Sequence, residues 1–105
     1  MDLVEKIYKL SVMFPTEEKF GLLSQIQRSA VSIPSNIAEG AGRNSNKEFK
    51  NFLSIAYGSS NELNTQLIIA QRVGYLKNDD TTLIFNQIEE VQKMLFSLIN
   101  KFSNL

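Results

Sequence analysis

The stretch that decides the fold is QIQRSAVSIPSNIAEGAG, from Gln25 to Gly42. Its apolar residues recur at alternating steps of three and four, which places them along one stripe of an α-helix. Counting from just before this stretch, the stripe consists of Leu23, Ile26, Ala30, Ile33 and Ile37. The pattern predicts a helix that buries this stripe in a protein core.

A second row on the same helix is polar. A solvated face is the simpler interpretation, but such a face usually carries Lys, Glu or Ala, whereas Ser and Asn are poor residues for a helix interior. We therefore expect a partly buried polar network along the row Gln25, Arg28, Ser32, Asn36 and Glu39.

Pro34 lies inside this predicted helix. Proline removes an amide donor, clashes with the carbonyl four residues earlier and disfavours helical geometry in the residue before it. The helix could break and restart at Pro34, or continue through a kink where Ser32 or Asn36 bonds the freed backbone groups. Because the apolar stripe runs unbroken across Pro34, the sequence favours the kink.

The first helix and the ends of the second can be placed from local signals. Residues 2–13 form a short amphipathic helix that ends at Phe14, and Thr16 is a candidate N-cap for the second helix. The second helix is predicted to run to about residue 39. Gly40 and Gly42 can then take the left-handed conformation that closes a helix.

Two further helices complete the chain. Ser45 and Glu48 make a capping box that opens a third helix, which ends at Gly74. Asp79 or Asp80 can cap a fourth helix, which continues to the C-terminus. No stretch shows a strand pattern. Short connections make neighbouring helices antiparallel, so we predict an all-α, up-down-up-down four-helix bundle in a single domain, residues 1–105, with the second helix kinked at Pro34.

The composition excludes several classes of function. The formal net charge is zero, so no global field attracts nucleic acid or an anionic membrane. There is neither cysteine nor histidine, which removes disulfides, thiolate catalysis and the commonest metal ligands. No stretch reads as a signal peptide or membrane span. We expect a soluble cytoplasmic protein without a metal or cofactor, and infer no small-molecule substrate.

Enzymatic activity is not expected from these residues. A di-iron bundle uses E-x-x-H pairs, which a chain without histidine lacks. The carboxylates of Glu39 and Glu48 both have structural interpretations at helix ends. The glycines of residues 39–47 lack the G-K-[ST] ending of a phosphate loop. We therefore predict no catalytic residue.

The polar rows of the second and third helices predict one specific contact. In an antiparallel hairpin that turns near Arg43, the guanidinium of Arg28 comes within reach of the Glu62 carboxylate. We predict an Arg28–Glu62 ion pair that fixes helix register, supported by hydrogen bonds from Ser32, Asn36, Glu39 and Ser59. Gly58, inside the third helix, is expected to admit a neighbouring helix or side chain closely.

Two surfaces are candidates for binding. A local basic cluster around the start of the third helix is a possible nucleic-acid contact: Arg43, Lys47 and Lys50. Against it, Glu48 dilutes the charge, and Phe49 fits a core position better than a base-stacking platform. Apolar residues beyond the needs of one bundle interior suggest a subunit interface, although core overflow explains one or two of them: Ile68, Ile69, Phe85 and Phe96.

Three blocks of the chain resemble a known family. They are EEKFGLLSQIQRSAVSIPSNIAEGAGR (17–43), NKEFKNFLSIAYGSSNEL (46–63) and VGYL (73–76), and the resemblance spans about residues 7–76. Together they resemble the bacterial four-helix-bundle family first met as proteins encoded in intervening sequences of 23S rRNA genes. The resemblance implies rings, typically homopentamers, whose biochemical activity is not established. A related group assists the reverse transcriptases of diversity-generating retroelements, using a basic surface that contacts protein and nucleic acid.

The chain departs from the family pattern in two respects. Family members usually carry about three more turns of helix before the position of Asp2, often with an aromatic and a lysine-rich segment. The balanced charge also differs from that of the basic accessory proteins. We therefore expect a non-catalytic, ring-forming interaction scaffold, with a nucleic-acid-binding accessory protein, or reverse-transcriptase partner, as the alternative.

Overall fold

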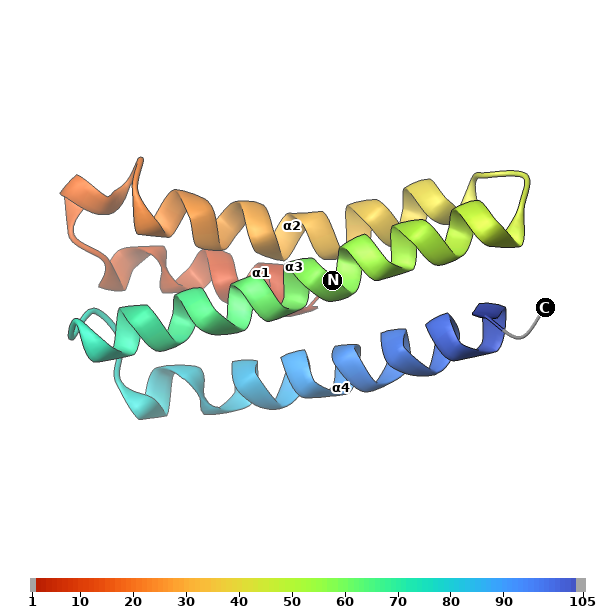
Figure 1. Ribbon diagram of the computed structural model, residues 1–105. Coiled ribbons are helices and arrows are strands. Elements are labelled where there is room, and N and C mark those ends of the chain that lie inside the picture. The colour runs from red at the N-terminus through yellow and green to blue at the C-terminus, as the bar shows by residue number, and fades with distance from the viewer. Residues whose placement is uncertain (1, 104–105) are drawn as a thin grey trace.

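A computed structural model describes residues 2–103 as an elongated bundle of helices, 46 × 23 × 19 Å (Figure 1). Its helices are α1 (Asp2–Lys9), α2 (Leu22–Ala41), α3 (Asn46–Arg72) and α4 (Asn78–Ser103). Neighbouring long helices run antiparallel, α2 against α3 and α3 against α4, and α1 packs on both α2 and α4. No strand occurs within this described range. The predicted all-α four-helix bundle is confirmed.

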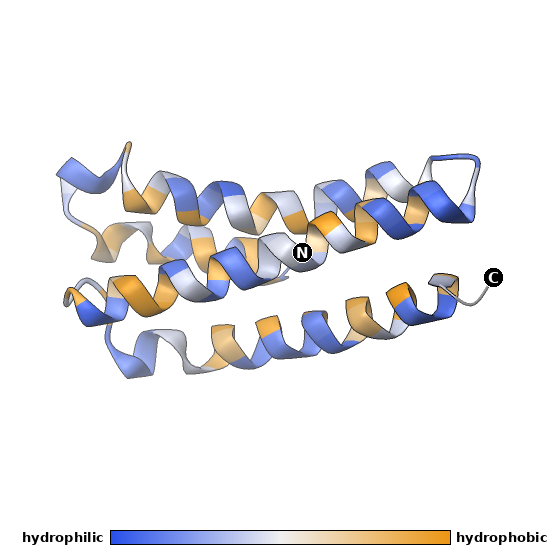
Figure 2. Ribbon diagram, viewed as in Figure 1, coloured by the Kyte–Doolittle hydropathy of each residue, from blue (hydrophilic) through white to orange (hydrophobic). Residues whose placement is uncertain are grey.

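The core lies where the apolar stripes of the four helices meet. Figure 2 shows apolar residues recurring along each helix between hydrophilic ones. The predicted stripe of α2 is buried at Leu23, Ile26, Ala30 and Ile33, and half-buried at Ile37. The other helices contribute buried side chains at the same three-four spacing, among them Ile7, Leu53, Ala56, Leu63, Leu67, Ala70, Ile84, Ile88 and Leu95.

The connection from α1 to α2 is more complex than predicted. A 3₁₀ turn, η1 (Leu10–Met13), extends α1 to the expected end at Phe14, and a second, η2 (Thr16–Glu18), follows Pro15. Thr16 is therefore not the N-cap of α2, which begins at Leu22. The N-cap residue is Gly21, which has no side chain to offer. Glu18 supplies the missing acceptor, because its Oε1 takes a 3.2 Å hydrogen bond from the Leu22 amide.

Helix α2 continues through Pro34 without a break. The alternative of two separate segments is thereby excluded, while the kink itself stays a prediction. The side-chain amide of Asn36 donates a 2.8 Å hydrogen bond to the carbonyl of Ser32. That carbonyl is not the one that Pro34 leaves without an amide partner, which belongs to Ala30.

The glycines at the end of α2 do not take the predicted left-handed conformation. Gly42 has φ −82°, and Gly40 lies inside the helix, buried against α3. A Cβ atom built on Gly40 would lie 2.6 Å from the Cβ of Phe52 and 2.9 Å from Cδ1 of Phe49. Gly40 is therefore needed for the close approach of α2 to α3.

Gly58, inside α3, and Gly74, just after it, behave differently from each other. Gly74 has φ +89°, the left-handed conformation expected just after a helix. Gly58 was expected to admit a close neighbour, but no atom of the described residues lies within 4 Å of the position of its missing Cβ. That expectation is wrong for the isolated chain, because Gly58 sits on the outer face of α3.

The predicted start signal of α3 is used as expected, whereas α4 begins at Asn78, so that Asp79 and Asp80 lie inside its first turn and neither is the N-cap. Ser45 is the N-cap of α3, and its hydroxyl accepts a 3.1 Å hydrogen bond from the Glu48 amide. Asp80 lies in the first turn of α4, and its Oδ2 accepts a 2.9 Å hydrogen bond from the Lys77 amide. Both helix starts are therefore encoded within four residues of sequence.

Candidate functional site

The polar row of α2 meets a polar row of α3 along the seam between the two helices. Ser29 Oγ donates a 2.8 Å hydrogen bond to Glu62 Oε1, and Gln66 Nε2 donates to the same oxygen at 3.3 Å. One turn further along, the hydroxyls of Ser32 and Ser59 are 2.8 Å apart. The Asn36 side chain extends the network by donating to Ser32 Oγ at 2.9 Å. A polar network thus joins α2 to α3 at the predicted place.

The predicted ion pair between Arg28 and Glu62 does not form. Arg28 is exposed, and the salt bridges found within residues 2–103 do not include it. Successive residues of an α-helix are turned by about 100°, so the helix that directs Ser29 at α3 directs Arg28 away from it. Glu62 is instead held by a hydroxyl and an amide. Small residues recur at steps of three and four along this face of α2: Ser29, Ser32, Asn36 and Gly40. That run is the signal that could have identified Ser29 as the partner of Glu62.

Glu39 was expected in this network but belongs to another contact. Its Oε1 lies 2.7 Å from Nη2 of Arg43, whose Nη1 lies 3.8 Å from Glu48 Oε2. The guanidinium also stacks over the ring of Phe52, 5.0 Å from its centroid. All three charged side chains are about half exposed, so these ion pairs add only modestly to the stability of the α2–α3 connection.

The candidate nucleic-acid residues are therefore only partly available. The charge of Arg43 is shared by two carboxylates. Lys47 is exposed in the first turn of α3, and Lys50 is half-buried one turn later. Phe49 packs on the core, as its core interpretation predicted, and its ring is tilted by 56° against the ring of Phe102, with 5.0 Å between the centroids. The cluster offers fewer cations than the sequence suggested.

The four candidate interface residues do not behave alike. Ile68, Ile69 and Phe96 are exposed on α3 and α4. Phe85, by contrast, is partly buried and packs against the core of its own chain. The position of the other three leaves subunit contact as a prediction.

Several polar contacts between helices were missed from the sequence. Gln92 on α4 donates to Ser60 Oγ at 3.1 Å and to Asn61 Oδ1 at 2.8 Å on α3. Gln71 donates to the buried hydroxyl of Thr81 at 2.6 Å. A polar residue that falls in an apolar stripe, as Ser60 and Thr81 do, was the available signal.

One tyrosine links the α3–α4 connection to the α1–α2 connection. Tyr75 donates a 3.3 Å hydrogen bond from its hydroxyl to Glu18 Oε2, and its ring lies tilted against the ring of Phe14, with 5.7 Å between the centroids. Desolvation, followed by the charge and hydrogen bond of Glu18 and the charge of Glu17, raises the pKa of Tyr75 above its usual value of 10.0. Glu18 therefore both caps α2 and anchors Tyr75.

The chemistry of these contacts is structural. The α2–α3 network contains hydroxyls, amides and a single carboxylate, which suits the fixing of register between helices. Across residues 2–103 no group of three acidic, histidine or cysteine side chains is placed to hold a metal ion. No described helix has the length and apolar character that crossing a bilayer requires.

Comparison with known proteins agrees with this architecture. Residues 1–97 match the model of the family described as 23S rRNA-intervening sequence protein. The chain belongs to this family. It is also similar to the crystal structure of a protein of unknown function from the S23 ribosomal protein family of Bacteroides thetaiotaomicron, with 30% identity over 92% of this chain and 90% of the other, and a TM-score of 0.82. No curated protein matches the chain.

Proposed function

We propose that this member of the intervening-sequence family is a non-catalytic, self-assembling interaction scaffold. The observation that carries the proposal is the outer face of α3, which is more apolar than a solvated helix requires. Ile69 and Val73 are 44% and 57% exposed there, and Ile55, 51% exposed, lies on the same side of the helix. A second copy of the chain would bury this face.

Gly58 supports the same proposal. A glycine inside an exposed helix is unfavourable by roughly 1 kcal/mol relative to alanine, and among residues 2–103 nothing lies within 4 Å of the position that a Cβ of Gly58 would take. Its lack of a side chain would let the backbone of a neighbouring subunit approach α3 closely. The family resemblance favours a homopentameric ring. Symmetry alone would favour a dimer, so the ring size rests on the resemblance.

Light scattering on the purified chain tests the proposal. We expect one species of about five times the mass of the 105-residue chain. Ile69→Glu should reduce the mass to that of the monomer, because a charge cannot be buried unpaired in an apolar interface. Val12→Glu, at an exposed apolar residue in the α1–α2 connection, is the matched control and should leave the mass unchanged. A monomeric wild-type chain would contradict self-assembly.

A further inference from the structure

The outer face of α3 carries one charge in the middle of its apolar residues. Ile55 and Ile69 are 51% and 44% exposed there. Glu62 lies between them on the same side of the helix, about 10 Å or two turns from each. A second copy of the chain that covers both isoleucines therefore also covers the Glu62 carboxylate. Because a carboxylate covered without a cation is strongly unfavourable, the interface of the proposed assembly needs a positive partner for Glu62.

Glu62 is held in place for such a partner. Ser29 and Gln66 donate hydrogen bonds of 2.8 and 3.3 Å to its Oε1. Within residues 2–103 no hydrogen bond ends on its Oε2, and no salt bridge includes this residue. The side chain is exposed. It thus presents an oriented carboxylate, without a counter-charge from the described chain, to whatever covers this face.

Arg28 is the cation that lies at the same level of the bundle. Its neighbour in the sequence, Ser29, is bonded to Glu62, so Arg28 and Glu62 lie at nearly the same height along the helices. Arg28 is the one cation of α2, it is exposed, and the salt bridges of residues 2–103 do not include it. One chain therefore offers both an unpaired cation and an unpaired anion at this level.

Other cations near this level fit less well. The cations of α3 closest to Glu62 are Lys50 and Arg72, and both are more than two helical turns away along the axis. On α4, Lys93 has a partner already, since its Nζ lies 3.3 Å from Glu89 Oε1. Arg28 is the cation left to meet Glu62.

We propose that Arg28 of one copy pairs with Glu62 of its neighbour and so fixes how the copies align. This pairing rests on the self-assembly through α3 proposed above. The bundle is a rod, 46 Å long and 23 by 19 Å across. In a ring of rods around an axis along their length, neighbouring copies meet at equal heights, which brings Arg28 of one copy level with Glu62 of the next. Such charge complementarity sets alignment and specificity more than affinity.

Charge reversal at the two positions tests the pairing. Glu62→Arg and Arg28→Glu should each stay monomeric in light scattering, at a concentration where the wild-type chain assembles. The first variant carries two cations at these positions and the second two anions, so an equimolar mixture should assemble again. With an affinity tag on one variant, a pull-down should then retain the other.

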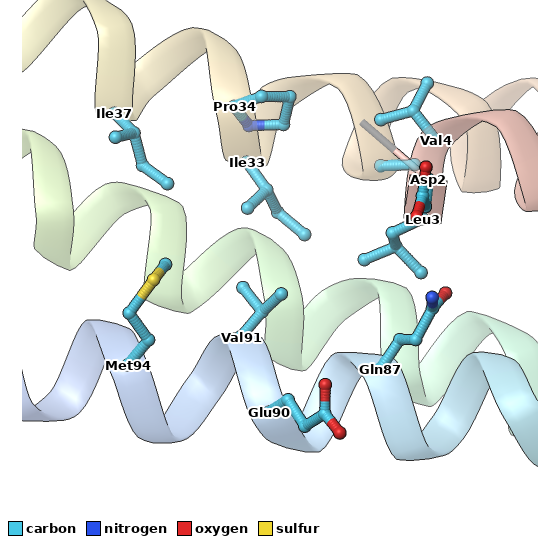
Figure 3. A pocket seen from close by; sticks show the side chains of 11 residues that line it. Asp2, Leu3, Val4, Ile33, Pro34, Ile37, Gln87, Glu90, Val91 and Met94 are labelled. Carbon is cyan, nitrogen blue, oxygen red and sulfur yellow. The ribbon is translucent and has the colours of Figure 1, made fainter.

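Two further variants guard against a trivial loss of fold. Glu62→Gln keeps an acceptor for the Ser29 hydroxyl but removes the charge, and it should raise the concentration at which the assembly dissociates at least about tenfold. Glu90→Arg is the matched control, because Glu90 is exposed on α4 and lines the groove between α2 and α4 (Figure 3), away from the α3 face. Its mass should equal that of the wild type, and circular dichroism should show the same helix content in all variants.

The outcomes separate this pairing from self-assembly itself. If both charge reversals keep the wild-type mass, the pairing is wrong and assembly through α3 stands. If the mixture stays monomeric while Arg28→Glu combined with Glu62→Arg in one chain assembles, the two groups pair within one chain and the proposal is also wrong. A monomeric wild-type chain would overturn the pairing together with the assembly.

Discussion

The hydroxyl of Ser29 on α2 donates a 2.8 Å hydrogen bond to Glu62 Oε1 on α3. This contact occupies the place where an ion pair with Arg28 was predicted. Because Ser29 is buried and Glu62 is exposed, the bond sits at the edge of the core, where a short side chain reaches a carboxylate that remains open to solvent. It fixes α2 against α3 at a small cost of desolvation.

Removing this hydroxyl should weaken the bundle more than removing the guanidinium next to it. We expect Ser29→Ala to lower the free energy of unfolding by about 1 kcal/mol, the value of a typical hydrogen bond. Arg28→Ala should change it by less than about 0.5 kcal/mol, because Arg28 is exposed and unpaired with Glu62. Urea denaturation in an Ile69→Glu background, at one fixed protein concentration, measures both. A larger loss for Arg28→Ala would restore the ion-pair prediction.

Gly40 is required by packing between helices. In Gly40→Ala the new Cβ would lie 2.6 Å from the Cβ of Phe52, so the helices must separate. We expect a loss of about 1–3 kcal/mol in the free energy of unfolding despite the better helix propensity of alanine. Unfolding in urea is the measurement, and a gain in stability would show that α2 and α3 are not this close.

Gly58 provides the opposite case on the partner helix. Nothing lies near its missing Cβ, so Gly58→Ala should stabilise the chain by about 0.5–1 kcal/mol through helix propensity. The comparison is best made by urea denaturation in an Ile69→Glu background, so that contact with a second copy does not enter. Destabilisation there would mean that Gly58 has an unseen neighbour within its own chain.

Tyr75 should make stability depend on pH in the alkaline range. Its pKa is raised in the folded chain, so the native state holds this proton more tightly than the unfolded state. The contribution of Tyr75 to the free energy of unfolding is therefore fully present below about pH 10, the ordinary tyrosine pKa. It is lost as pH rises through the raised pKa of the folded chain. Tyr75→Phe should flatten the fall in urea midpoint above pH 10, while Tyr8→Phe controls for the loss of one tyrosine. An equal slope in wild type and Tyr75→Phe would contradict the Glu18 contact.

Nucleic-acid binding through Arg43 is not expected. Its guanidinium lies 2.7 Å from Glu39 and 3.8 Å from Glu48, so Arg43→Ala should leave filter retention of a short duplex RNA unchanged. The measurement is repeated at two salt concentrations. Binding that weakens steeply with salt and is lost in Arg43→Ala would show real phosphate contacts and favour the accessory-protein alternative.

Much of the fold could be predicted because helix signals are local. The capping box at Ser45 works between residues three apart, and the left-handed Gly74 follows directly after the helix it ends. The apolar stripe across Pro34 also predicted that α2 would continue. Thr16 failed as an N-cap because the acceptor came from Glu18, which lies within an additional 3₁₀ turn that the sequence pattern did not indicate.

The candidate site could be predicted only as a region. Polar residues at three-four spacing placed a network between α2 and α3, and Ser32, Asn36 and Ser59 belong to it. Which neighbour of that row faces the other helix depends on how each helix is rotated about its axis. Neighbouring residues are turned by about 100° from each other around the helix axis. That difference is enough for Ser29, and not Arg28, to face α3.

The sequence by itself determined four helices, the start of α3 and the stripes that form the core, since these depend on residues a few positions apart. Tertiary structure alone decided that Gly40 and not Gly58 marks the close approach, and that Glu18 meets Tyr75 across 57 positions. It also decided that a groove remains beside α1. The physical reason is that rotation, spacing and overlap of packed helices are set by how side chains from distant segments fit together.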